Sequence, residues 1–172
     1  PTGPDNDIES FNNDGVHVAQ FYYEHAITTG LVASVGQLDP TAYFDTNKFA
    51  NSERVHFLAN GFANNPAVEF GGTDNFYGPG LRLTYGAAEF VDISMGAFEG
   101  NGDYNDPFDG PFLMAEADFK LKPMGRDGNY RIYYWNRQGR QDLTYTANPR
   151  DTGLLKAENK GIGVSMDQKI TD

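Results

Sequence analysis

Two arginines and two aromatic residues alternate along one short segment in a pattern suited to binding a sugar. Arg131, Tyr133, Trp135 and Arg137 are spaced two residues apart, so on a β-strand all four lie on one face. A sugar presents hydroxyl groups around its rim and a weakly apolar ring face, which suit charged groups and flat aromatic rings. The same pattern is typical of an aromatic girdle at a membrane boundary, or of a solvated face in a soluble sheet. The spacing therefore predicts a shared face and leaves its ligand open.

Charged side chains recur with the same period of two on other segments. Glu116, Asp118 and Lys120 alternate with Ala117 and Phe119, which are apolar. The polar positions of all such segments, which we take as candidates for lining a pore, are Arg82, Asp92, Glu116, Asp118, Lys120, Arg131, Tyr133, Trp135, Arg137, Asp167 and Lys169. A row of charges is usually just a solvated face, so the charges alone do not imply contact with a substrate.

Motifs for catalysis are weak. The three histidines, His17, His25 and His56, have no zinc-ligand spacing and stand beside no nucleophile motif. The Gly-Pro-Gly at 78–80 is predicted to be a turn rather than a phosphate-binding loop. We therefore predict that the protein is not an enzyme.

Oxygen-bearing side chains at alternate positions suggest calcium at one place. Asp45 and Asn47, with Asn51 nearby, fit that habit, but the glycine and glutamate of an EF-hand loop are not in register. We predict no metal and no other cofactor.

Composition narrows the class of protein. The 172 residues suit one domain, and the net charge of -11 argues against a nucleic-acid partner, because phosphate binding needs a basic surface. The chain has no cysteine, and no stretch approaches the roughly 20 apolar residues of a membrane helix. Aromatics at 14% and 20 glycines favour strands and turns.

Strict alternation of apolar and polar residues predicts an all-β, antiparallel fold. It is clearest at 113–122 and recurs at 81–86, 91–97, 130–135 and 162–169, with weaker strands at 16–27 and 31–38. We count about seven or eight strands of roughly 8 to 12 residues, which is the length that a tilted strand needs to cross a bilayer. A soluble sandwich and a membrane barrel both show this period, and hydropathy does not separate them.

The predicted connections differ in length. Those at 28–30 and 123–128 are short turns, whereas those at 100–111 and 138–158 are long and polar. Short turns at one end and long loops at the other are typical of an outer-membrane barrel, although a soluble meander can show them too. Residues 1–15 are predicted to be a polar lead-in. The segment 40–65 breaks the alternation and is predicted to hold a short helical turn after Asp39 and irregular chain.

This irregular segment makes the chain recognisable. Residues 36–51 (GQLDPTAYFDTNKFAN), 57–58 and 64–67, with weaker support from 21–25 and 161–172, resemble the OprB family of carbohydrate-selective porins. The resemblance implies a transmembrane β-barrel of sixteen strands in the outer membrane of a diderm bacterium, whose lumen passes small sugars by passive diffusion. With about half the strands and no signal peptide or terminal aromatic residue, we expect this chain to be an internal portion of such a porin.

The resemblance also implies a role for the irregular segment as a loop that narrows the pore. Its polar residues Asp45, Asn47, Lys48, Glu53 and Arg54 would then form the constriction. Three phenylalanines, Phe44, Phe49 and Phe57, would anchor it. The expected partners are small sugars and outer-membrane lipid, with a homotrimer left open. A soluble all-β carbohydrate-binding or structural module is the alternative.

Overall fold

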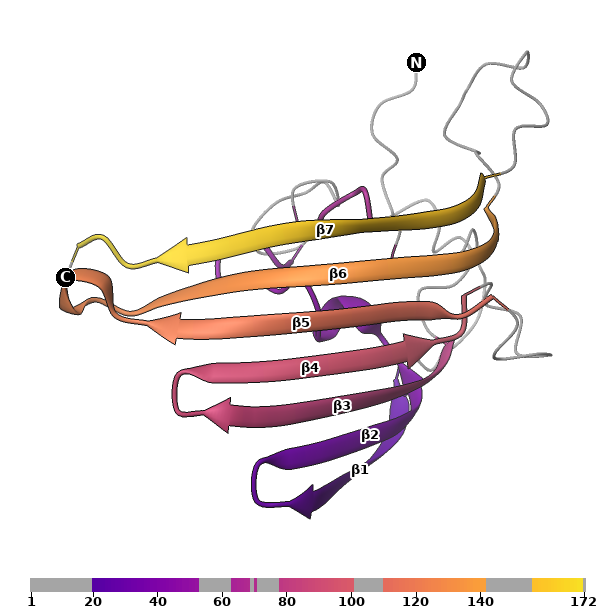
Figure 1. Cartoon of the computed structure of the whole chain (residues 1–172), viewed down its shortest axis with the longest axis horizontal. Coiled ribbons are helices and arrows are strands. Elements are labelled where there is room, and N and C mark those ends of the chain that lie inside the picture. The colour runs from indigo at the N-terminus through magenta and orange to yellow at the C-terminus, as the bar shows by residue number, and fades with distance from the viewer. Residues whose placement is uncertain are drawn as a thin grey trace, which may run out of the picture.

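The alternating segments form one antiparallel sheet (Figure 1). The computed structural model describes residues 20–52, 63–68, 70, 78–100, 110–141 and 156–171. Its strands are β1 (Phe21–Thr28), β2 (Leu31–Leu38), β3 (Gly78–Ala88), β4 (Val91–Phe98), β5 (Phe112–Leu121), β6 (Gly128–Gln141) and β7 (Lys156–Gln168). Each strand pairs with the next in sequence, so the 7-stranded sheet is an up-and-down meander. Among the described residues β1 and β7 are its two edges, and the sheet is not closed. The predicted all-β antiparallel fold is confirmed.

The pairing register places like residues side by side. Glu116 of β5 lies opposite Tyr133 of β6, and Ala117 lies opposite Ile132. Because side chains alternate between the faces of a strand, this register collects polar groups on one face and apolar groups on the other. We call these the inner face and the outer face.

The outer face is apolar and exposed across the sheet. Its large apolar side chains with at least a third of their area exposed include Val35, Leu81, Leu83, Ile93, Met95, Leu113, Ile132, Ile162, Val164 and Met166. Soluble monomers rarely expose a contiguous apolar surface of this extent. In the described residues no helix has the length and apolar character needed to cross a membrane.

The inner face carries the core, which forms against a returning segment. The residues 39–52, 63–68 and 70, drawn in purple and magenta after β2, pass behind β5, β6 and β7 in Figure 1. The core consists of Leu38, Phe44, Val68, Phe70, Phe98, Phe112, Met114, Tyr133 and Trp135. Phe44 from the segment packs edge-on against Phe98 of β4, with ring centroids 5.9 Å apart. Burial of a phenylalanine side chain stabilises such a contact by about 1.5–3 kcal/mol.

The segment begins with the helical turn expected after Asp39. The 3-10 turn Pro40–Ala42 is capped by the Asp39 carboxylate, which accepts a hydrogen bond from the Thr41 backbone N–H at 2.9 Å. Proline at the first helical position suits this turn because its missing N–H would have no partner there.

The connections have the predicted asymmetry. The turns β1–β2, β3–β4 and β5–β6 are short and lie at one end of the sheet (Figure 1), whereas the connections β2–β3, β4–β5 and β6–β7 are longer. Gly30 closes the first turn with φ of +91°, a left-handed conformation that glycine adopts without steric penalty. Much of the long connections, and the predicted lead-in at 1–15, fall outside the described residues.

One predicted turn is wrong. Residues 78–80 form the start of β3, where Pro79 pairs with Gln37 and its carbonyl accepts the Glu99 N–H at 2.8 Å. Proline is tolerated near a strand start because the ladder loses only one donor there. Gly80 is needed for packing, since a Cβ at this position would stand 2.5 Å from the Phe98 ring.

Candidate functional site

The inner face carries a network of charges at its short-turn end. Arg131 of β6 is 8% exposed and pairs with two carboxylates, Asp167 at 3.0 Å and Asp118 at 3.5 Å. Lys120 of β5 pairs with Asp92 of β4. These pairs join neighbouring strands, which the antiparallel register brings together. The result is a charged strip whose Lys120 and Asp92 side chains stay open to solvent.

Two aromatic rings lie next along the inner face of β6. Tyr133 and Trp135 are 2% and 5% exposed, with ring centroids 6.1 Å apart. They cover glycines of β7: a Cβ at Gly163 would stand 2.2 Å from the Tyr133 ring, and one at Gly161 would stand 2.5 Å from the Trp135 ring. The rings therefore fit only because β7 has no side chain at these two positions.

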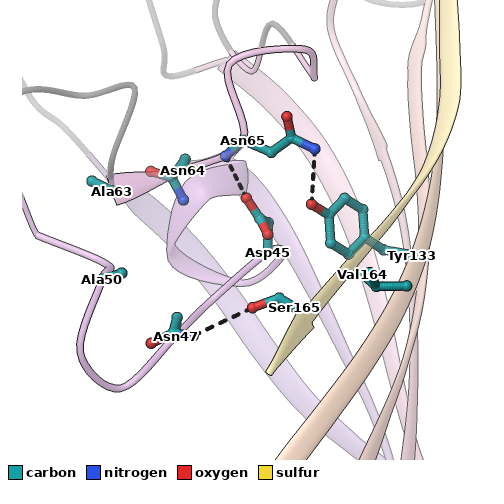
Figure 2. A pocket seen from close by; sticks show the side chains of 9 residues that line it. All are labelled: Asp45, Asn47, Ala50, Ala63, Asn64, Asn65, Tyr133, Val164 and Ser165. Carbon is teal, nitrogen blue, oxygen red and sulfur yellow. Dashed lines mark hydrogen bonds between the residues drawn. The ribbon is translucent and has the colours of Figure 1, made fainter. Parts of the chain in front are cut away.

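Asp45 connects the returning segment to the inner face of the sheet, which we also call the wall (Figure 2). Its backbone N–H donates to Glu116 Oε2 at 2.8 Å, and its carboxylate accepts the Asn65 backbone N–H at 2.6 Å. The Asn65 side chain in turn donates to the Tyr133 hydroxyl at 3.0 Å. Two parts of the segment, at 45 and at 65, are thereby joined to each other and to β5 and β6.

Amide side chains connect the segment to β7 as well. Asn159 of β7 accepts a hydrogen bond from Trp135 Nε1 at 2.9 Å and donates to the Ala67 carbonyl at 3.1 Å. Asn47 donates to the Met166 carbonyl at 3.0 Å and lies 3.5 Å from the Ser165 hydroxyl. The segment therefore contacts three successive strands of the inner face.

Arg82 of β3 lies at the start of the segment. Its guanidinium is 4.5 Å from the centroid of the Tyr43 ring, a cation–π contact, and the Tyr43 hydroxyl donates to Gln20 at 3.0 Å. Burial is the main cause that raises the pKa of Tyr43 to about 12, so this hydroxyl stays protonated as a donor.

Burial also raises the pKa of both carboxyls of the segment. For Asp45 the desolvation outweighs the hydrogen bonds from Asn65 and Tyr133 and the attraction of Arg131, all of which favour the charged form. For Asp39 it outweighs the hydrogen bonds from Thr41 and Ala42. Both carboxyls act as hydrogen-bond acceptors within the segment, in surroundings that disfavour their charged form.

A pocket of about 210 Å³ opens between the segment and the strands β6 and β7 (Figure 2). Its lining is mostly polar and consists of Asp45, Asn47, Ala50, Ala63, Asn64, Asn65, Tyr133, Val164 and Ser165. Amide, carboxylate and hydroxyl groups suit a ligand that carries hydroxyls. In the part of the chain that the structure describes, no three histidine, cysteine or acidic residues form a metal-binding group.

The structure separates the predicted wall residues into covered and open groups. Arg131, Tyr133, Trp135, Glu116 and Arg137 are at most 8% exposed. Arg137 donates to the Gly100 carbonyl and lies 6.0 Å from the Phe112 ring. The more open wall side chains are Lys120, which is exposed, and Arg82, Asp92 and Asp118, which are half-buried. Trp135 points to the inner face, where it belongs to the core. Lys169 lies beyond β7 and is exposed.

The predicted loop residues also divide. Asp45 is buried, Asn47 is half-buried, and Lys48 is exposed with its ammonium 5.7 Å from the Phe49 ring. Phe44 anchors the segment as expected, but the prediction for Phe49 is wrong, since its side chain is 58% exposed. The remaining predicted residues, Glu53, Arg54 and Phe57, lie outside the described residues.

Sequence reasoning missed several residues that hold this arrangement. Asn65 and Asn159 each bridge the segment and the wall, and Gly161 and Gly163 make room for the rings. The glycines had a signal, because they alternate on β7 at the same period as the aromatic residues of β6. The asparagines had none, because an isolated asparagine in a loop or at a strand end is more often a turn residue.

Comparison with known proteins gives a consistent set of relatives. The family model "Carbohydrate-selective porin, OprB family" matches residues 4–172. A protein of Aquifex aeolicus, described as uncharacterized, is 27% identical over 132 residues, which cover 77% of this chain and 33% of that protein. The high-pH structure of Pseudomonas putida OprB superposes with a TM-score of 0.64 at 20% identity, over 89% of this chain and 40% of that one. The chain thus spans about a third to two fifths of the length of these two proteins.

Proposed function

This chain belongs to the OprB family of carbohydrate-selective porins, and from that membership we propose that it forms part of the wall of an outer-membrane pore through which small sugars diffuse passively. The family and the fold indicate a channel rather than an enzyme. The family also implies the outer membrane of Gram-negative bacteria as the location.

The observation that supports the proposal most is the difference between the two faces of the sheet. The outer face exposes large apolar side chains from β2 to β7. The inner face carries the ion pairs of Arg131 and Lys120. A strand in a membrane barrel has lipid on one side and water on the other, and this sheet has an apolar face that suits lipid and a charged face that suits water. A soluble sheet would leave the apolar face in water at a large free-energy cost.

We propose that the open charged side chains of the wall contact the sugars. Arg82, Asp118 and Lys120 can exchange hydrogen bonds with hydroxyl groups without binding them tightly, as a conducting pore requires. The covered residues Tyr133 and Trp135 support the wall in this proposal rather than stack on the sugar. Because the open charges include both signs, the favoured sugars are small and uncharged.

We further propose that the returning segment, described at 39–52, 63–68 and 70, belongs to the constriction expected between 40 and 65. Its contacts with β5, β6 and β7 support this, since they hold it on the inner face instead of outside the sheet. A segment in this place narrows the lumen by its own thickness. The exposed Lys48 then faces the passage.

Planar-bilayer recording tests the proposed function directly. The protein extracted from its native membrane is added to a bilayer, and conductance is recorded with and without mono- and disaccharides. We expect stepwise conductance that added sugar reduces. A well-folded protein that fractionates without detergent and gives no conductance would contradict the porin and favour the soluble module. A homotrimer stays a prediction, which crosslinking in the native membrane can test.

A further inference from the structure

We propose that Glu116 is a positioning residue: it holds the returning segment (residues 39–52, 63–68 and 70) across the inner face through the backbone of Asp45, and this contact sets the largest sugar that passes. The inference rests on the proposed function, because only a pore has a size limit. Glu116 is a residue that the sequence analysis assigned to the lumen, and the structure gives it a partner in the segment.

Glu116 is a buried carboxylate with an unusual partner. It is 7% exposed at the middle of β5, and its Oε2 accepts the Asp45 N–H at 2.8 Å. Arg131 attracts Glu116, but its ion pairs are with Asp118 and Asp167. A buried carboxylate is costly to the fold unless hydrogen bonds compensate for its lost hydration. The hydrogen bond that compensates Glu116 comes from the segment, so the two are energetically linked.

Asp45 has a backbone conformation that needs such a partner. Its φ of +54° is left-handed, which is unfavourable for a residue with a side chain. Such a conformation persists where surrounding contacts hold it, and the contacts here are Glu116 on the N–H and Asn65 on the carboxylate. Loss of the Glu116 acceptor would therefore leave a strained residue with an unpaired buried N–H.

The position of Asp45 makes this one contact important for the whole segment. Through its carboxylate Asp45 also holds Asn65, which is 20 residues further along the chain and reaches Tyr133. Release at Asp45 thus weakens both attachments to β5 and β6. Loss of the acceptor leaves a buried N–H unpaired, which corresponds to a roughly five- to hundredfold change in the ratio of docked to undocked segment.

The test compares two substitutions of Glu116 in the intact porin. Glu116→Ala removes the acceptor, whereas Glu116→Gln removes the charge and keeps a carbonyl oxygen at the same place. Swelling of proteoliposomes gives the rate of entry for mono-, di-, tri- and tetrasaccharides. Each rate is divided by that of the monosaccharide, so that differences in yield cancel. Asp127→Asn is the matched control, because it removes a carboxylate from the exposed β5–β6 turn.

We expect Glu116→Ala to raise the trisaccharide-to-monosaccharide ratio severalfold, and Glu116→Gln and Asp127→Asn to stay near the wild-type ratio. An unchanged ratio in Glu116→Ala would overturn the proposal. An equal rise in Glu116→Gln would overturn it too, since the charge of Glu116 and not its contact would then control passage. If the wild-type protein admits no sugar at all, the proposed function fails, which is a different result.

A cross-link tests the same idea without changing Glu116. Asn47 and Ser165 approach to 3.5 Å, and the chain has no cysteine, so the pair Asn47→Cys and Ser165→Cys can be oxidised selectively within it. If Glu116 already holds the segment, oxidation leaves the size ratios of the double variant unchanged. A severalfold fall of the trisaccharide ratio on oxidation, reversed by a reductant, would show a segment that moves freely and would overturn the proposal even if Glu116→Ala fails to fold.

Discussion

Met95→Arg separates a lipid-facing sheet from a soluble one more sharply than other single substitutions. Met95 lies in the middle of β4 on the outer face, between Leu83 of β3 and Ala115 of β5. Its side chain is 57% exposed. In a soluble sheet an arginine here would sit on the surface and change the free energy of unfolding by about 0.5 kcal/mol or less.

The same arginine in a bilayer is far more costly. A charge on the lipid face near the midplane of a barrel costs about 2–4 kcal/mol. That corresponds to a roughly 30- to 700-fold fall in the folding equilibrium constant. The two interpretations of the outer face therefore differ by at least about 1.5 kcal/mol at this residue, which is larger than the usual error of a denaturant titration.

The assay is reversible folding of the intact porin into lipid vesicles, followed by urea titration. Met95→Leu is the control, because it keeps the volume and the apolar character of the side chain. Ile93→Arg, two residues earlier on the same face of β4, should give a similar loss of folding free energy. If Met95→Arg unfolds within about 0.5 kcal/mol of Met95→Leu, the outer face does not meet lipid and the reasoning is refuted.

Three further outcomes are expected. Trp135→Ala should lower the free energy of unfolding by about 3–5 kcal/mol in thermal unfolding, because it leaves a cavity and removes the donor to the Asn159 side-chain oxygen. A loss below about 1 kcal/mol would show that the fold does not need the ring. Gly163→Ala should lower the free energy of unfolding by about 1–3 kcal/mol, because the new Cβ overpacks against the Tyr133 ring. The control Gly86→Ala should change it little, since its Cβ would meet its nearest atom at 3.7 Å. Equal losses in the two variants would contradict this packing. Burial raises the pKa of Asp45 above its ordinary 3.8, so protonation of this carboxyl favours the docked segment. The stabilisation of docking by this proton is lost as pH rises through the raised pKa. Fluorescence of Trp135, the only tryptophan of the chain, should therefore show no release of the segment between about pH 7 and pH 5, and a red shift on acidification would contradict the assigned sign.

The strands and their faces were predictable from sequence because alternation is a local property. The period of two at 113–122 predicts which side chains of β5 share a face, and the structure places Leu113 outside and Glu116 inside accordingly. The helical turn after Asp39 was predictable as well, because its cap and its proline are adjacent in sequence. The membership of a porin family depended on residues 36–67 more than on any strand, since alternation is common to many β-proteins.

The roles of the inner-face residues were not predictable in the same way. Alternation assigned Arg131, Tyr133, Trp135 and Glu116 to the lumen, and it gave no sign that another part of the chain covers them. The turn predicted at 78–80 failed for a related reason, because the Phe98 ring that needs Gly80 comes from the next strand. Local signals do not report which ring or segment lies above a residue.

The sequence by itself determined the strands, the two faces of the sheet and the family of this chain. Each follows from residues close together along the backbone, whose geometry fixes the direction of every second side chain. Only the tertiary structure decided which inner-face groups are open and which hold the segment. That choice depends on contacts such as Asp45 with Glu116, which are 71 residues apart, and Asn65 with Tyr133, which are 68 apart. Such pairs meet only after the sheet has formed and the segment has folded over it, because the packing of the whole face selects them.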